Sequence, residues 1–237
     1  MIQFDEDKQN RKMSDLLKRE EEELVQLLSA KYGIEYIDLS VNPINTDALR
    51  LIEEKKAEDF LKEKNLNSDD LIIGMSVTVG NKIKQWDLSK FASLADLLVE
   101  RARAKIIFTG SADDRPMVEK VQQTMQNKSV TAAGFFKLYE LPALLKNFKL
   151  FISVDSGPLY IANALNVPVV DIGGSGDIQE QAPSGDKCQI VQKNNYRPFQ
   201  SFIIPIPRSV QEEYFRHLQE ITPEDVFEAS VKLLEIK

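Results

Sequence analysis

The segment from Asp155 to Tyr160, which reads DSGPLY, combines residue types that suit the binding of an anion. An apolar run of strand length ends at Asp155, and a helical pattern begins shortly afterwards. Gly157 lets a ligand approach the backbone closely, and Pro158 suits a first helical position, where its missing N–H costs nothing. The free N–H groups of that turn, at the positive end of the helix dipole, favour a phosphate. The same segment is equally compatible with an ordinary strand-to-helix turn in which Asp155 or Ser156 caps the helix.

A second candidate is the loop from Val79 to Trp86, which contains a glycine and two lysines, Lys82 and Lys84. Such a loop between a strand and a helix can wrap phosphates, with lysine acting as a point charge. It is not a Walker P-loop, because no second glycine precedes a Gly-Lys-Ser/Thr sequence. The only tryptophan, Trp86, could form a wall of the pocket, but we expect it to anchor the next helix in the core, as large aromatic residues usually do.

Two further clusters also follow predicted strands, and alone each is a weaker signal. The turn from Thr109 to Asp114 could line a ribose or base pocket, or it could simply cap a helix. The stretch from Gly173 to Asp177 is rich in glycine and could be only a flexible turn.

The elements that must position these residues alternate between strands and helices. Continuous apolar runs predict strands, and helical periods predict helices between them. The predicted strands cover residues 71–77, 105–110, 150–155, 168–174 and 188–191, and the predicted helices cover residues 89–102, 112–126, 138–148 and 158–166. This order indicates an α/β fold, a single Rossmann-like parallel sheet with helices on both faces. Ligands bind beyond the carboxyl ends of such strands, where all the clusters lie.

A small, mostly helical segment is predicted before the sheet, and two helices are predicted after it. A helical stripe over residues 12–32 ends at Gly33, and a new helix begins at Asp47 after a cap at Asn45 or Thr46. In the tail, residues 209–237, Thr222-Pro223-Glu224-Asp225 is a typical helix start. We therefore divide the chain into a small helical segment, residues 1–56, and an α/β domain, residues 57–237.

Composition excludes several classes of function. The 237 residues are 43% hydrophobic and 28% charged, which is typical of a globular protein. The net charge of −7 argues against nonspecific nucleic-acid binding. Cys188 and His217 are the only residues of their types, which excludes an intrachain disulfide, a cysteine-cluster zinc site and any site that needs two imidazoles. No signal peptide and no transmembrane stretch is evident, so we expect a cytoplasmic protein.

Four landmarks in order resemble the nucleotide-binding half of the ADP-heptose:lipopolysaccharide heptosyltransferase family (glycosyltransferase family nine), over about residues 57–237. The family has a lysine two residues before a tryptophan, a threonine-glycine turn followed by an acid, a glycine before a short helix, and the signature Asp-Ser/Thr-Gly-Pro-x-His-x-x-x-Ala. The matching positions here are Lys84, Thr109 with Asp114, Gly134, and DSGPLYIANA at residues 155–164. The resemblance implies the C-terminal half of a GT-B glycosyltransferase.

The resemblance also implies roles for individual residues. Lys84 would hold the diphosphate, residues 155–157 would bind the sugar-phosphate end, and the nucleoside would lie beside the turn at residues 109–114 and the segment around Phe136. Tyr160 stands where the family has histidine. The substrate-binding residues so implied are Lys84, Thr109, Asp114, Phe136, Asp155, Ser156, Gly157 and Tyr160. The catalytic residues are not identified, and no metal or other cofactor is implied, since the ADP-linked sugar is a substrate.

The chain departs from the family at its beginning. Family members have a further N-terminal Rossmann-like domain that supplies the acceptor site and the proposed general base, and residues 1–56 are too few for one. Residues 10–56 instead resemble the N-terminal domain of type II secretion and type IV pilus assembly ATPases.

The sequence supports two hypotheses on function. The first is a heptosyltransferase-like domain that binds ADP-heptose or a related ADP-sugar for transfer to lipopolysaccharide or another glycan. Such a domain would act in the cytoplasm or peripherally at the inner face of the membrane, with a partner chain supplying the acceptor domain. The second is a noncatalytic binding or assembly module of a secretion or pilus system.

Overall fold

The computed structural model describes residues 46–80, 82–173, 183, 185–193 and 208–235. The chain divides into two compact units, Met1–Leu49 and Arg50–Lys237, and the second contains the whole sheet described below. The helix predicted over residues 12–32 lies outside the described residues. The predicted boundary between residues 56 and 57 falls inside the first described helix, and the division made there stays a prediction.

Six strands of the described residues form one sheet, and every strand pair is parallel. The order is β3-β2-β1-β4-β5-β6, so the direction of winding reverses between β1 and β4. Ligands of doubly wound sheets bind at this reversal, which is called the switch point. The strands are β1 (Ile72–Ser76), β2 (Lys105–Thr109), β3 (Val130–Thr131), β4 (Leu150–Val154), β5 (Val169–Ile172) and β6 (Cys188–Val191).

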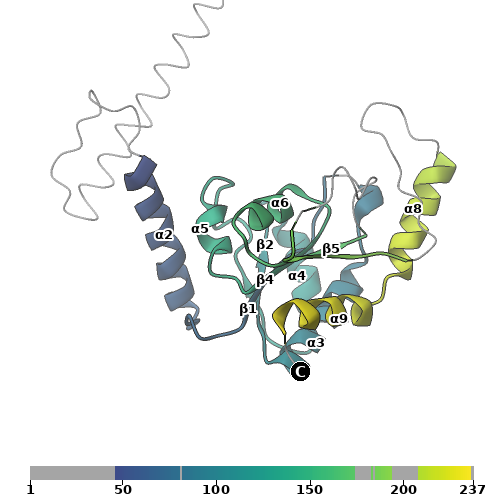
Figure 1. Ribbon diagram of the computed structural model, residues 1–237, viewed down its shortest axis with the longest axis horizontal. Helices are drawn as coiled ribbons and strands as arrows, with labels where there is room; N and C mark the ends of the chain where they lie inside the picture. Colours follow the sequence, from purple (N-terminus) through teal and green to yellow (C-terminus); the bar gives the residue numbers. More distant parts are fainter. Residues whose placement is uncertain (1–45, 81, 174–182, 184, 194–207, 236–237) are drawn as a thin grey trace, which may run out of the picture. The chain divides into compact units, whose positions relative to one another are not determined.

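Helices cover both faces of the sheet, as the continuous apolar strands predicted (Figure 1). Ile73 and Met75 point into a core beneath α3, α4, α8 and α9, whereas Ile72 points into a second core beneath α5, α6 and residues 50–63 of α2. The helices are α2 (Thr46–Glu63), α3 (Leu88–Ala102), α4 (Arg115–Thr124), α5 (Leu141–Leu145), α6 (Gly157–Ala164), α8 (Arg208–Glu220) and α9 (Pro223–Leu234). No helix among the described residues is long and apolar enough to cross a membrane.

Trp86 lies in the core just before α3, the helix that it was predicted to anchor. Its side chain is fully buried and packs edge-on against Phe91, with ring centroids 4.9 Å apart. Its indole N–H donates to the carbonyl oxygen of Ile221, 3.1 Å away, between α8 and α9. The side-chain amide of Gln219 donates to the carbonyl oxygen of Gln85 at 3.0 Å. These contacts fix the loop that precedes α3 against the C-terminal helices.

Strand β3 is the one described element of the sheet that the sequence pattern does not predict. Val130 and Thr131 are only half-buried, and the strand is two residues long at the edge of the sheet. It pairs with Ile107 and Phe108 of β2. An edge strand with one neighbour needs no continuous apolar run, so the signal used for the central strands is missing here.

Candidate functional site

The two strands beside the switch point are followed by residues that meet each other. After β1, the loop forms a short 3₁₀ turn, η1 (Lys82–Lys84), and Asp155 follows β4 directly. The Lys84 ammonium donates to Oδ2 of Asp155 and forms an ion pair with it. The lysine side chain is 19% exposed and the aspartate side chain 7%. The two clusters therefore meet at the carboxyl edge of the sheet.

Tyr160 contacts the same carboxylate. Its hydroxyl donates to Oδ1 of Asp155 at 2.5 Å, from within α6. Asp155 thus accepts hydrogen bonds on both oxygens, one from each side of the switch point. We call Lys84, Asp155, Gly157 and Tyr160 the switch-point site.

The N-terminus of α6 opens beside this carboxylate. Ser156 is the N-cap residue, yet its side chain makes no capping hydrogen bond, and its Oγ lies instead 2.8 Å from Oγ of Ser153. The Ser156 side chain therefore does not cap α6, which was one of the alternatives for this turn. Gly157 is exposed, and a Cβ added there would meet no described atom within 4 Å. First-turn amides that lack a side-chain cap suit an anion.

Thr109 and Asp114 shape the turn after β2 from within. Thr109 is buried, with its hydroxyl 3.4 Å from the carbonyl oxygen of Met75. Oδ2 of Asp114 accepts hydrogen bonds from the backbone N–H and the hydroxyl of Ser111, each 2.7 Å long. A Cβ at Gly110 would come within 2.9 Å of the Asp114 Cβ, so this close turn requires glycine. Contact of Thr109 and Asp114 with a nucleoside stays a prediction.

The segment after β3, which includes Phe136 and was predicted to lie beside the nucleoside, lies beside that turn. The backbone N–H of Gly134 donates to the carbonyl oxygen of Gly110 at 2.9 Å. Phe136 is only 8% exposed and packs edge-on against Phe60, with ring centroids 5.3 Å apart. Phe135 is 43% exposed. The Phe136 side chain thus belongs to the core, and Phe135 is the exposed aromatic residue that the sequence reasoning did not single out.

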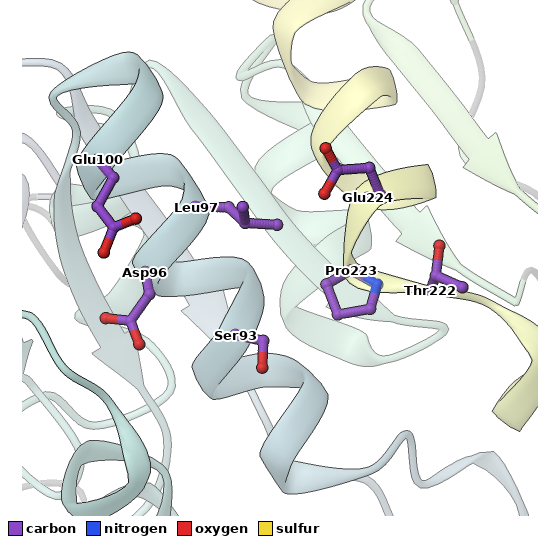
Figure 2. Close-up of a pocket in the computed structure, with 7 residues that line it drawn as sticks. All are labelled: Ser93, Asp96, Leu97, Glu100, Thr222, Pro223 and Glu224. Atoms are coloured by element: carbon purple, nitrogen blue, oxygen red, sulfur yellow. The ribbon is translucent and has the colours of Figure 1, made fainter.

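A pocket of about 390 Å³ lies elsewhere, between α3 and the start of α9 (Figure 2). Its carboxylates already have partners. Asp96 accepts hydrogen bonds from the backbone N–H groups of Gln126 and Asn127, Glu100 accepts one from the Asn127 side chain, and Glu224 pairs with Arg101. It contains no residue of the switch-point site.

The only cysteine is poorly suited to nucleophilic chemistry. Cys188 is half-buried at the start of β6. Burial, and to a lesser extent the Asp171 carboxylate, raises the pKa of its thiol to about 11. It therefore stays protonated near neutral pH, and the thiol is a much weaker nucleophile than the thiolate.

A doubly wound parallel sheet of this order is a Rossmann-like fold, a class in which ligands bind at the switch point. The sequence profile of glycosyltransferase family 9 (heptosyltransferase) matches residues 22–202. The chain belongs to this family.

Individual relatives agree with the family. The chain is 30% identical over 185 residues to lipopolysaccharide heptosyltransferase 3 of Escherichia coli K12, covering 75% of this chain and 52% of the relative. It is 31% identical over 156 residues to lipooligosaccharide heptosyltransferase 2 of Haemophilus influenzae, covering 64% and 43%. Among solved structures, the family 9 glycosyl transferase of Veillonella parvula has a TM-score of 0.67 at 26% identity, covering 78% of this chain and 52% of that one. The chain thus spans about half the length of the relatives it matches.

The structure of E. coli ADP-heptose lps heptosyltransferase II shares the fold, with a TM-score of 0.62 at 21% identity over 77% of this chain and 52% of that one. The family match begins at residue 22, within the segment that also resembles secretion and pilus ATPases. That second resemblance lies mostly outside the described residues and stays a prediction.

Proposed function

We propose that this chain binds a nucleoside-diphosphate sugar, ADP-heptose or a related ADP-linked sugar, as the donor for glycosyl transfer to lipopolysaccharide or another glycan. The observation that carries the proposal is the meeting of Lys84 and Asp155 at the switch point, beside the open N-terminus of α6. A diphosphate placed there would contact the ammonium of Lys84 and the first-turn amides at Gly157. The names of the relatives, which are heptosyltransferases, support the choice of donor.

The reaction in this proposal is direct displacement at the anomeric carbon. The bond from that carbon to the diphosphate oxygen breaks, its electron pair stays with the leaving diphosphate, and an acceptor hydroxyl forms the new bond and loses its proton. Lys84 and the amides at Gly157 would stabilise the charge that develops on the leaving group. These groups do the neutralising, so we propose that no metal ion is needed and that the ADP-sugar is a substrate rather than a cofactor.

Asp155 is a poor choice for the general base in this scheme. Its two oxygens accept hydrogen bonds from Lys84 and Tyr160, and its side chain is 7% exposed. Because the matched relatives are about twice as long, we propose that the acceptor site and the base come from sequence outside the matched half, on a partner chain or another segment. We also propose a cytoplasmic location, peripheral to the inner face of the membrane where a lipid-linked acceptor would lie.

Isothermal titration calorimetry with ADP, UDP and GDP tests the donor assignment. We expect saturable binding of ADP and weaker or no binding of the other two nucleotides. Saturable binding of none of the three would contradict the proposal and would fit the noncatalytic module instead.

A further inference from the structure

We propose that Tyr160 is a positioning residue, whose hydroxyl fixes the Asp155 carboxylate and, through it, aims the Lys84 ammonium at the donor diphosphate. This inference rests on the function proposed above and assigns a specific role to Tyr160. The family signature has histidine at this position, and in this chain a tyrosine hydroxyl donates to the carboxylate.

The two hydrogen bonds of Asp155 come from opposite sides of the switch point. Lys84 lies in the loop after β1, whereas Tyr160 lies in α6, after β4. The ammonium contacts Oδ2 and the hydroxyl contacts Oδ1, at 2.5 Å. Both oxygens are therefore engaged at once, and the orientation of the carboxylate is set by two separate elements of the fold.

The Asp155 side chain is buried, so the loss of either hydrogen-bond donor would leave it poorly solvated. At 7% exposure, water can replace little of what the Asp155 side chain would lose if a donor were removed. The torsion that turns a carboxylate about its own axis is soft, so two donors are needed to hold it in one orientation. Without the Tyr160 hydroxyl, Asp155 would turn toward other donors and its Oδ2 would no longer hold the ammonium in one place.

Pairing with Asp155 does not prevent Lys84 from binding phosphate. An ammonium has three donor protons, so a lysine can donate to a carboxylate and to a phosphate at the same time. A lysine side chain loses much rotational freedom when its ammonium is fixed, and a ligand that finds it already fixed binds more tightly. The expected contribution of Tyr160 is therefore to affinity for the diphosphate, without direct contact with it.

The first test needs no nucleotide. We expect the ¹H–¹⁵N signal of the Lys84 ammonium to be visible in the wild-type chain, because an ion pair slows exchange with water, and to be lost or broadened in Tyr160→Phe. The signal of Lys56, which pairs with Glu140 at 2.6 Å, should be unchanged. Tyr139→Phe, which removes the hydroxyl of an exposed tyrosine, is the matched control and should leave the Lys84 signal intact. An unaltered Lys84 signal in Tyr160→Phe would overturn the proposal.

The second test is a double-mutant cycle on ADP affinity, measured by calorimetry. We expect Tyr160→Phe to weaken binding about three- to tenfold, which is less than the loss of a charge-assisted hydrogen bond, because Tyr160 acts on the diphosphate only through Asp155 and Lys84. In a Lys84→Ala background the same change should have less than about a twofold effect, since the group being aimed is gone. Equal losses in both backgrounds would overturn the proposal. If the wild-type chain binds no ADP, the proposed function fails, while the ammonium signal still decides whether Tyr160 positions Lys84.

Discussion

Replacing Lys84 with alanine should weaken ADP binding by about 10- to 150-fold. A charge-assisted hydrogen bond to phosphate contributes about 1.5–3 kcal/mol, and each 1.4 kcal/mol is about a factor of ten in affinity. Because the Asp155 side chain is buried beside Lys84, we expect a loss of affinity near the upper end of this range. Asp155 is 7% exposed, and without Lys84 its negative charge would stand beside the incoming diphosphate without its ammonium partner.

Calorimetric titration with ADP measures this change directly, and the control should remove a lysine elsewhere. Lys149 is exposed and precedes β4, at the amino edge of the sheet, opposite the switch-point site. Lys149→Ala lowers the net charge by the same amount and should change the affinity by less than about twofold, because distant exposed charges are screened by salt. Thermal unfolding should show that both variants are folded. An affinity of Lys84→Ala equal to that of Lys149→Ala would mean that the diphosphate does not bind where we place it.

Three further predictions concern the N-terminus of α6, the metal-free reaction scheme and the N-cap of α3. Gly157→Ala should unfold at the wild-type temperature, because its Cβ meets no described atom within 4 Å, yet bind ADP at least several-fold more weakly; unchanged affinity would show that no ligand approaches there. EDTA should leave ADP binding unaltered in calorimetry, and a loss restored by Mg²⁺ would refute the metal-free scheme. Hydrogen bonds from the hydroxyl and backbone N–H of Ser89 lower the pKa of Asp87, the N-cap of α3, so its stabilisation is present at neutral pH and is lost as pH falls through that lowered pKa. Asp87→Ala should therefore lower the free energy of unfolding by about 1 kcal/mol at pH 7 in urea denaturation, and by less near pH 3; an equal loss at both pH values would contradict this.

Most of the sheet and its helices could be predicted because β1, β4 and β5 are continuous buried runs and β2 is buried after its first residue. Strand β6 forms over the residues predicted, 188–191, and β1 and β4 lie within their predicted ranges. The start of α9 follows the same logic, since Thr222 and Asp225 form the capping box that their sequence suggests. The strand positions and the start of α9 could be predicted because they depend on local sequence patterns and not on contacts between distant residues.

Side-chain direction was harder to predict than position. Phe135 and Phe136 are adjacent, and only the packing of Phe136 against Phe60, far away in sequence, decides which ring is buried. The contact from Tyr160 to Asp155 was likewise not expected. The family signature predicts which residues gather at the switch point, but it contains no information on how this chain accommodates tyrosine in place of histidine.

A crystal structure of the chain with ADP tests the central claim most directly. The account predicts diphosphate oxygens within hydrogen-bonding distance of both the Lys84 ammonium and the backbone N–H at Gly157, with Tyr160 still donating to Asp155. A diphosphate bound away from these two groups would contradict it.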